Sequence, residues 1–575
     1  MSHPLRASVV GALHILGATV LAAQGAPTPW GAWAALGRTP DLQRYSPLTE
    51  ITRANVKNLS VAFNFSTGVL GPHDGNPLVV NDVMYVHTPA PNRVYALDLA
   101  RPGAPTRWTY APADPPSGPG TTLGLAYHPS GKLFLALASG ALVALDAKTG
   151  TVVWRIQPDS GPGALAPRTP FVVKDVVLLG AGGAGVRGRV SAYDVATGAE
   201  RWRAYSTGPD SEVRLTPPAK ALYPSMQGAN LGASTWGAQS GAGGAATGWY
   251  AYDPQLDLVY YGSGRPAPAN ADVRPGDNKW SMTIWARHPD DGRVAWVYQT
   301  TPHDEWGYDG LNEMILVDIL VSGEPVKALV HFDENGFAYT LDRRTGKVLL
   351  AEPYGQVTWA SRIDLATGLP AVNPAFATSA TQTTQGVCPA AIGLKTLAPA
   401  AYSPQTGWFY VPTVNACMDY HGPEAARDGP LVGGVVSMYP GLGGYRGRLI
   451  AWDATAGKVK WVVTEPLPLG GGALTTAGGL IFYGTLDGWL KALDQHSGAE
   501  LWRFKTAAGI VGSPISYLGP DGRQYVAILS GVTPTGAVQD SNATLAAVAT
   551  GGGPTNAGGI LTVFALPAPP SPPPH

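Results

Sequence analysis

The ten residues TPHDEWGYDG, at positions 301–310, bring together His303, Asp304, Glu305 and Asp309 with two aromatic rings and two glycines. Imidazole and carboxylate groups can act as general acids and bases, and carboxylate oxygens are ligands for hard cations such as Ca²⁺. The same groups can also do no more than hydrogen-bond a loop. The stretch is therefore a candidate proton-handling site, a candidate metal site or a structural loop, and the rest of the chain has to decide between them.

A repeat predicts the elements that must position this stretch. An alternating apolar segment, an Asp, a turn ending in Gly and a segment carrying Trp recur along the chain, most clearly in LVALDAKTGTVVW at residues 142–154, VSAYDVATGAERW at 190–202, LIAWDATAGKVKW at 449–461 and LKALDQHSGAELW at 490–502. Further copies of the same unit start at residues 94, 283 and 339. Alternation with a period of two residues predicts strands, and the Asp-to-Gly segments between them predict tight turns.

Strand repeats of roughly 40–50 residues are typical of β-propellers. Seven copies and a last strand, LTVFAL at residues 561–566, predict an all-β, eight-bladed β-propeller in which the last strand completes a blade with the N-terminal part of the chain. We expect most of the 17 Trp residues to pack between neighbouring blades. The long spacers before residues 283 and 449 are expected to cover or build a site.

The composition and the N-terminal residues restrict the classes of binding partner and the cellular compartment expected for the protein. Charged residues make up 14% of the 575 residues and the formal net charge is −1, so no strong field would attract nucleic acid or an anionic membrane. Residues 1–25 resemble a signal peptide, with Arg6, an apolar run and small residues before a cut ahead of Ala26; a short membrane anchor is the alternative. Residues 26–566 would form the propeller, without a transmembrane span in the mature chain, and the Pro-rich residues 567–575 a disordered tail. We therefore expect a periplasmic or secreted protein.

The chain has two cysteines, Cys388 and Cys417. An exported chain with two cysteines is expected to form one disulfide. The sequence has neither a CxxC pair nor a Cys/His cluster, so it does not predict a zinc site.

Long blocks of the sequence resemble a known family. WAALGRTPDLQRYSPLTEITRANVKNL (residues 33–59), RPGDNKWSMTIWAR (274–287), CPAAIGLKTLAPAAYSPQTGWFYVPTVNACMDY (388–420) and LTTAGGLIFYGTLDGWLKALD (474–494) resemble the quinoprotein alcohol dehydrogenases of the methanol and ethanol type. The resemblance runs from about residue 30 to residue 566. It implies a periplasmic eight-bladed propeller that binds pyrroloquinoline quinone (PQQ) and a calcium or lanthanide ion on its central axis and oxidises alcohols. It also implies a disulfide between Cys388 and Cys417.

In that chemistry the cation polarises the quinone carbonyl as a Lewis acid, and a carboxylate removes the alcohol proton as a general base. The resemblance places the general base at Gly307, where the family motif has Asp. Asp309 stands where lanthanide-using members carry an additional ligand, and is the remaining candidate base. His303, Asp304 and Glu305 fall in the part of the motif that builds the scaffold.

The chain departs from the family at further pocket positions. The Glu ligand of the metal is missing from GGAGVRG, residues 182–188, where Gly185 lies. Arg265 stands in place of the Asn ligand, Thr247 in place of the Trp on which the cofactor stacks, and Glu334 in place of the Lys or Arg beside the quinone. Leu123 replaces a cofactor-contacting Arg, Leu469 or Gly470 replaces a ring Trp, and Asp74 replaces a Glu. Thr396 is a further candidate pocket position.

These departures leave three hypotheses open. The protein is an active PQQ dehydrogenase with a rebuilt site, a cofactor-free propeller that binds a small alcohol or another axial ligand, or an assembly partner of another periplasmic protein. The sequence favours the interpretation that PQQ and Ca²⁺ or a lanthanide are not bound in the family manner. It also predicts that Arg265 replaces the lost cation and lies within about 4 Å of a carboxylate of Asp309 or Glu334.

Overall fold

The structure, a computed structural model, describes residues 30–113, 124–158, 169–183, 186–217, 219, 234–237, 241–379, 381–421, 435–532 and 558–567. The predicted signal peptide at residues 1–25 lies outside the described residues, as does all of the predicted tail except Pro567. No helix in the described part of the chain is long and apolar enough to cross a membrane.

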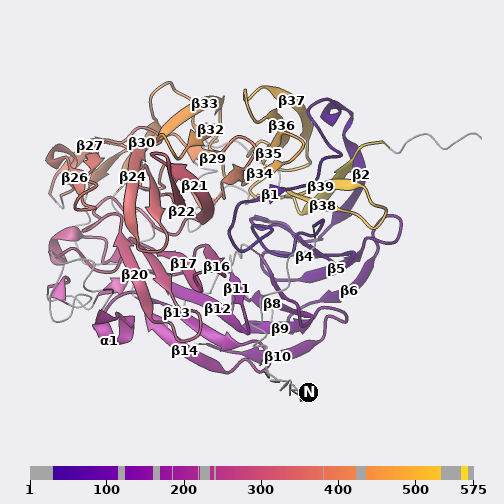
Figure 1. Cartoon of the computed structure of the whole chain (residues 1–575), viewed down its shortest axis with the longest axis horizontal. Coiled ribbons are helices and arrows are strands. Elements are labelled where there is room, and N and C mark those ends of the chain that lie inside the picture. Colours follow the sequence, from indigo (N-terminus) through magenta and orange to yellow (C-terminus); the bar gives the residue numbers. More distant parts are fainter. Residues whose placement is uncertain are drawn as a thin grey trace, which may run out of the picture.

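In the described residues, eight blades of four antiparallel strands each stand around a central axis (Figure 1), and three further short strands join two of these sheets. Their strands, from the inside to the outside, are as follows for blades one to four: β3 (Leu78–Val80), β4 (Val83–His87), β5 (Val94–Asp98) and β6 (Thr106–Tyr110); β7 (Ala126–His128), β8 (Lys132–Ala136), β9 (Leu142–Asp146) and β10 (Val152–Ile156); β11 (Pro170–Val173), β12 (Val176–Gly183), β13 (Val186–Asp194) and β14 (Glu200–Tyr205); β16 (Tyr250–Asp253), β17 (Leu258–Ser263), β19 (Thr283–Arg287) and β20 (Val294–Gln299).

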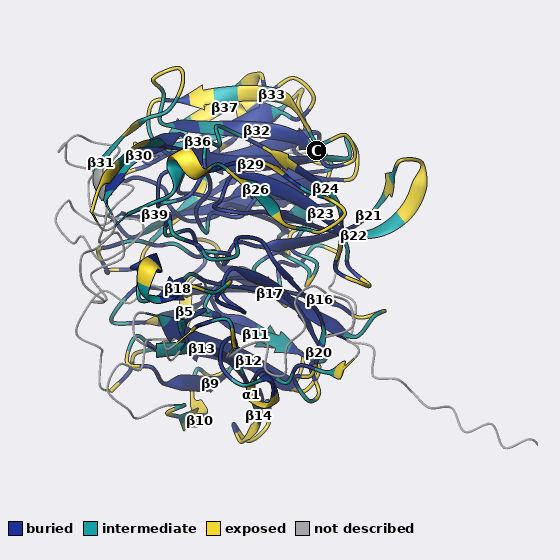
Figure 2. Ribbon diagram, turned by 90° about the vertical axis from the view of Figure 1, so that its left-hand side faces the viewer, coloured by how far each residue is buried: buried dark blue, intermediate teal, exposed yellow. Residues whose placement is uncertain are grey.

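Blades five to eight follow in the same order: β21 (Met314–Val321), β22 (Glu324–Phe332), β23 (Phe337–Asp342) and β24 (Lys347–Pro353); β28 (Ala401–Ser403), β29 (Trp408–Val414), β32 (Gly447–Asp453) and β33 (Lys458–Glu465); β34 (Ala473–Thr476), β35 (Leu480–Gly484), β36 (Trp489–Asp494) and β37 (Glu500–Lys505); β38 (Ile515–Leu518), β39 (Gln524–Ser530), β40 (Ile560–Ala565) and β2 (Ser60–Ser66). The predicted all-β, eight-bladed propeller is confirmed. Figure 2 shows the buried interior of the blades and the more exposed outer strands and loops.

Blade eight joins the two ends of the described chain. Its outermost strand, β2, comes from the N-terminal part and pairs antiparallel with β40, with Ser60 opposite Ala565. The expected completion of a blade by the last strand is therefore confirmed. The pairing covers one backbone edge of β2 and joins the N-terminal part of the chain to the last blade.

The smaller elements lie in the insertions and at the N-terminus: β1 (Tyr45–Ser46), η1 (Val56–Asn58), α1 (Asp210–Val213), β15 (Ala242–Gly243), β18 (Pro266–Ala267), η3 (Ala271–Val273), β25 (Ala360–Ile363), β26 (Pro370–Val372), η4 (Pro374–Phe376), β27 (Thr383–Val387), β30 (Ala416–His421) and β31 (Val435–Pro440). The long spacers noted in the sequence thus carry α1, β15, β18 and η3 before residue 283, and β25, β26, η4, β27, β30 and β31 before residue 449.

The Trp residues of the repeat pack between blades, as expected. Gly346, in the turn after β23, has φ +77°, and a Cβ there would lie 2.5 Å from the ring of Trp296 in the preceding blade. The Trp296 Nε1–H donates a hydrogen bond to the Arg343 carbonyl of the same turn, at 2.9 Å. The same contact of a turn glycine with the preceding Trp recurs at Gly150 and Trp108, Gly198 and Trp154, Gly292 and Trp202, and Gly498 and Trp461. The glycine of the motif therefore serves both the turn and the inter-blade contact.

Residues 31–46, which we call the N-terminal strap, cross the axis. The strap exchanges backbone hydrogen bonds with blades one, four, five and six, through residues including Trp33, Pro40, Asp41 and Gln43, and pairs with blade seven through β1. Its Arg44 is 1% exposed and donates to carbonyls of Leu36, Ala473 and Pro514. The strap therefore ties distant blades together where their inner strands run.

Candidate functional site

Arg265, Asp309 and Glu334 form a connected group, which we call the axial triad. The backbone N–H of Arg265 donates to Asp309 Oδ1 at 2.8 Å, and Arg265 Nε donates to Asp309 Oδ2 at 3.1 Å. Arg265 Nη2 also donates to Oδ2. The Asp309 backbone N–H donates to Glu334 Oε2 at 2.8 Å. The prediction that Arg265 lies within about 4 Å of one of these carboxylates is confirmed, with Asp309 as its partner.

Blade four positions Arg265. The residue follows β17 and precedes β18, whose Pro266 pairs with Gly243 of β15. The Arg265 carbonyl accepts a hydrogen bond from the Gly244 N–H at 2.8 Å. Gly243 has φ +91°, and a Cβ there would lie 2.5 Å from the Arg265 carbonyl oxygen. A glycine is therefore needed for the backbone of β15 to approach Arg265 this closely.

The loop before β21 positions Asp309, and Asp304 organises that loop. The buried Asp304 carboxylate accepts the backbone N–H groups of Gly307 at 3.1 Å and of Trp306 and Tyr308 at 3.4 Å. The Tyr308 hydroxyl donates to the Pro389 carbonyl at 2.9 Å. The predicted scaffold role of Asp304 therefore has a direct geometric basis: its side chain holds the backbone that leads into Asp309.

Glu305 and His303 have hydrogen-bond partners outside the axial triad. Glu305 Oε2 accepts hydrogen bonds from the N–H and the hydroxyl of Thr378, and His303 Nδ1 lies 2.9 Å from the Gly276 carbonyl. These contacts join the loop to its neighbours, which is the scaffold role expected for both residues. Residues 301–310 are thus largely a hydrogen-bonded loop, and Asp309 is the one carboxylate of this loop in the axial triad.

Gly307 leaves space beside the Arg265 guanidinium. A Cβ at Gly307 would lie 3.5 Å from Arg265 Nη1 and 3.6 Å from the Ala391 Cβ, which are ordinary contact distances. The backbone has φ +84°, a conformation that Asp tolerates better than most residues. Gly307, where the resemblance places the general base, therefore lies next to the Arg265 guanidinium. The space there can accommodate the Cβ of a side chain.

Glu334 is buried in the turn between β22 and β23, with 8% of its surface exposed. Burial, and then the negative charge of Asp309, raise the pKa of Glu334 well above its usual range, although Arg265 opposes this shift. Burial would lower the pKa of Arg265, but the Asp309 carboxylate more than offsets that effect and the pKa of Arg265 ends above its usual value. The triad therefore favours a charged Arg265 and a neutral Glu334.

The other predicted pocket residues belong to the loops that lead into inner strands. Asp74 precedes β3, Thr247 precedes β16, and Thr396 precedes β28. Thr396 is buried, and its carbonyl accepts a hydrogen bond from Lys395 Nζ at 3.1 Å. Leu469 and Gly470 are buried before β34. Gly185 and Leu123 lie outside the described residues.

A buried ion pair next to the triad was not singled out by sequence reasoning. Lys395 Nζ lies 2.7 Å from Glu313 Oε2, with side chains 0% and 1% exposed. The other carboxylate oxygen of Glu313 accepts the Ala400 N–H at 2.8 Å. Burial lowers the pKa of Lys395, and the charges of Glu313 and Glu334 oppose that shift. Lys395 lies within the block at residues 388–420 that carries the resemblance, but a single sequence does not reveal its partner.

The predicted disulfide between Cys388 and Cys417 is present, with a Cα–Cα distance of 4.4 Å. It fixes the start of the loop that precedes β28. In that loop the Ala390 N–H donates to the Ala416 carbonyl at 2.9 Å, and Ala391 lies against the space at Gly307. The bridge therefore supports one wall of the candidate site.

The donor set of the described residues does not fit a calcium or lanthanide ion. In this part of the chain no three His, Cys, Asp or Glu side chains are arranged to hold a metal ion. Asp309 accepts hydrogen bonds from Arg265 at both carboxylate oxygens. A guanidinium about 4 Å from a divalent cation would be repelled by roughly 8 kcal/mol at an effective dielectric constant of 20.

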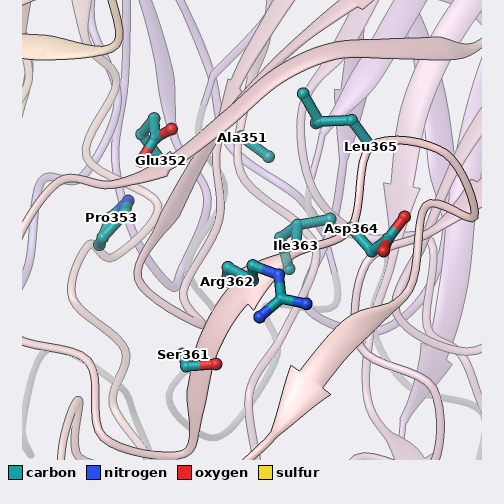
Figure 3. A pocket seen from close by; sticks show the side chains of 8 residues that line it. All are labelled: Ala351, Glu352, Pro353, Ser361, Arg362, Ile363, Asp364 and Leu365. Atoms are coloured by element: carbon teal, nitrogen blue, oxygen red, sulfur yellow. The ribbon is translucent and has the colours of Figure 1, made fainter.

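A depression of about 330 Å³ on the molecule lies elsewhere, beside β24 and β25 (Figure 3). Its lining residues run from Ala351 to Pro353 and from Ser361 to Leu365. None of the predicted site residues lines it, so the axial triad and its surroundings remain the candidate site.

The fold is a closed all-β propeller, and loops of blades four and five bring Arg265, Asp309 and Glu334 together. Residues 33–352 and 450–526 match the family described as "PQQ: Glucose/ethanol/alcohol dehydrogenase, beta-propeller domain". The chain is 48% identical over 557 residues to the lanthanide-dependent methanol dehydrogenase of Methylorubrum extorquens, covering 91% of this chain and 92% of the relative. It is 47% identical over 519 residues to the enzyme of the same name from Methylacidiphilum fumariolicum, covering 87% and 85%.

A solved structure shows the same relationship. The structure titled "Europium-containing methanol dehydrogenase" superposes with a TM-score of 0.88 and 44% sequence identity, covering 94% of this chain and 98% of the other. The protein therefore belongs to the PQQ-dependent alcohol dehydrogenase family, as the resemblance in its sequence indicates.

Proposed function

We propose that this protein is a member of the PQQ-dependent alcohol dehydrogenase family in which an internal guanidinium–carboxylate pair has taken the place of the catalytic metal ion. In this proposal it does not oxidise alcohols by the metal-assisted mechanism. The observation that carries the proposal is the three-point contact of Arg265 with Asp309. A carboxylate engaged in this way is a poor metal ligand, because a cation would first have to displace the guanidinium.

The surrounding changes support the same conclusion. Gly307 has no side chain to remove a proton from an alcohol. Both carboxylate oxygens of Asp309, the remaining candidate, already accept hydrogen bonds from Arg265, so a substrate hydroxyl would have to displace the guanidinium to reach them. Glu334 favours its neutral form, and where ionised it would place negative charge in the position that the family gives to a cation beside the quinone.

Two roles remain for such a protein: binding of a small axial ligand without redox chemistry, or interaction with a periplasmic protein. The resemblance to signal peptides at residues 1–25 supports export. Mass spectrometry of the secreted or periplasmic protein checks this, because cleavage before Ala26 gives a defined N-terminal mass.

The second candidate function is alcohol oxidation with PQQ by a rebuilt site. The observation that favours it is the 47–48% identity to proteins named lanthanide-dependent methanol dehydrogenases, over most of both chains. Bound PQQ would supply a quinone able to accept the two electrons of an alcohol. In this case Asp309 would have to leave Arg265 and hold the substrate proton.

Titration of the purified protein with PQQ, in the presence of La³⁺ or Ca²⁺ and then without metal, separates the two candidates. We expect neither metal-dependent PQQ binding by calorimetry nor dye-linked oxidation of methanol or ethanol. Gly307→Asp alone should not restore activity, because Arg265 still holds Asp309. Metal-dependent PQQ binding at micromolar affinity or better, with alcohol oxidation, would establish the second candidate.

A further inference from the structure

A second groove lies between blades eight and one, away from the axial triad. It has a volume of about 450 Å³. One wall consists of Phe63 on β2 with Tyr517 and Tyr525 of blade eight, and Leu99 and Ala104, from the turn between β5 and β6, form the other. It is the open end of the apolar interface between these two blades.

The register places the aromatic wall on a single face of blade eight. Phe63 is opposite Val563, and Val563 is opposite Ala527, two residues from Tyr525. Tyr525 is paired with Tyr517, and their rings stack with centroids 5.4 Å apart. Because side chains alternate along a strand, Phe63, Tyr517 and Tyr525 all point toward blade one.

The rim of the groove adds two prolines and a balanced pair of charges. Pro102 and Pro520 line it, together with Arg101 and Asp521. One cation and one anion give the rim no net charge, so it does not favour a charged ligand. An aromatic and proline-lined groove of this kind fits an uncharged, extended, proline-rich segment, because such grooves bind preformed polyproline II helices.

We propose that residues 568–575 of this chain, APPSPPPH, occupy the groove. Five of these eight residues are proline and none is Lys, Arg, Asp or Glu. The described chain passes the groove just before this segment: Ala565 is opposite Ser60, two residues from the lining residue Ala62. The Leu566 carbonyl accepts a hydrogen bond from Arg523, two residues from Tyr525.

Length and stiffness allow the segment to reach its site. Eight residues in the polyproline II conformation span roughly 25 Å at 3.1 Å per residue. The segment needs no folded structure of its own, because the prolines already restrict its backbone and less conformational entropy is lost on docking. Covalent attachment also gives it an effective concentration in the millimolar range, so a weak contact is sufficient.

Binding in trans tests the groove. A chain ending at Pro567 is titrated with the synthetic peptide APPSPPPH by calorimetry. We expect saturable binding that weakens about tenfold or more in Tyr525→Ala and is retained in the matched control Tyr525→Phe, which keeps the ring. Circular dichroism checks that both variants fold. Absence of binding to the parent chain, or equal binding to both variants, would overturn the proposal.

Spin-label distances test docking in the intact chain. The two native cysteines are bridged, so Ser571→Cys and the exposed position Thr106→Cys provide two free thiols. We expect a narrow distance distribution that broadens when the five prolines of the segment are changed to glycine. A distribution unaffected by this change would overturn the proposal, and so would the narrow distance appearing in a mixture of two singly labelled chains, because the segment would then occupy a second copy.

Discussion

Arg265 makes three hydrogen bonds to the Asp309 carboxylate, one through its backbone N–H and two through its guanidinium. The Arg265 side chain is 24% exposed and the Asp309 side chain 18%, so the pair is mostly shielded from water. Partial burial makes the two charges depend on each other, because either charge left alone would have lost its hydration without a partner. The pair is therefore expected to contribute to the stability of the folded chain.

A double-mutant cycle measures this dependence. We expect Arg265→Met and Asp309→Asn each to lower the free energy of unfolding by about 2–3 kcal/mol, somewhat below the range for fully buried pairs. The double variant should be more stable than the sum of the single losses by about 1–3 kcal/mol. Urea denaturation of the four chains provides the comparison. Strictly additive losses would mean that the guanidinium and the carboxylate do not support each other.

Asp304 should make stability depend on pH. Burial raises the pKa of Asp304 to about 7, although Arg274 and Arg265 oppose the shift. In the unfolded chain the carboxyl has its ordinary pKa near 3.9, so between about pH 4 and pH 7 the folded state binds more protons than the unfolded state. Stability should therefore fall as the pH rises through this range, by at most about 4 kcal/mol at 1.36 kcal/mol per pKa unit.

Asp304→Asn isolates this contribution. The amide cannot ionise, so the free energy of unfolding of the variant should decrease less steeply between pH 4 and pH 7 than that of the parent. A smaller decrease of the same sign should remain because of the buried Glu334. The Nδ2 of the amide cannot accept the Gly307 N–H, so a lower stability at pH 4 is also expected. An unchanged slope in denaturation experiments across this range would assign the pH dependence to other groups.

At the scale of the elements, the repeat was predictable because one local motif serves two purposes. The Asp and Gly of each copy form the turn, and the Gly also lets the turn approach the Trp of the preceding blade, as Gly346 approaches Trp296. The turn and the contact with Trp each require particular residues at constant spacing, so both are visible in the sequence. The pattern therefore identified the strands, the number of blades and the packing role of the Trp residues before the structure.

The site was less predictable, since its contacts join loops far apart in the sequence. Arg265 and Asp309 could be paired only through the resemblance, which placed both on the axis. The link from Asp309 to Glu334 and the pair of Lys395 with Glu313 depend on how blades four, five and six are set against one another. Distances between side chains on different loops cannot be inferred from the spacing of residues along the chain.

Two glycine substitutions separate the role of the turn from that of the contact. Gly346 and Gly407 have φ +77° and +72°, but only at Gly346 would a Cβ meet another group, the Trp296 ring at 2.5 Å. We expect Gly407→Ala to cost about 1–2 kcal/mol through backbone strain alone, and Gly346→Ala to cost about 1–3 kcal/mol more through overpacking. Thermal and urea unfolding give both values. Equal losses of unfolding free energy in the two variants would show that the blade interface can accommodate an added methyl group.

For the molecule as a whole, the disulfide between Cys388 and Cys417 should be a global stabiliser. It closes a segment with a sequence separation of 29, which corresponds to roughly 3–4 kcal/mol in the chain-entropy treatment. We expect the double variant Cys388→Ala/Cys417→Ala to unfold at lower denaturant concentration by that free energy, and added reductant to leave its stability unchanged. A double variant as stable as the parent would mean that the surrounding β27, β30 and β31 hold the loop without the bridge.

The pairing of β2 with β40 has a consequence for biosynthesis. The ribosome releases β2 early and β40 only when almost the whole ring has been made, and at roughly 5–20 residues per second this interval lasts tens of seconds. Throughout that time the nascent chain carries β2 as a strand without its neighbour, which is a template for intermolecular pairing. A truncated chain that lacks residues 558–567 would remain in this state permanently. The ring is thus closed by β40, the last strand to be made, and termination anywhere between β2 and β40 would leave the same edge of β2 unpaired.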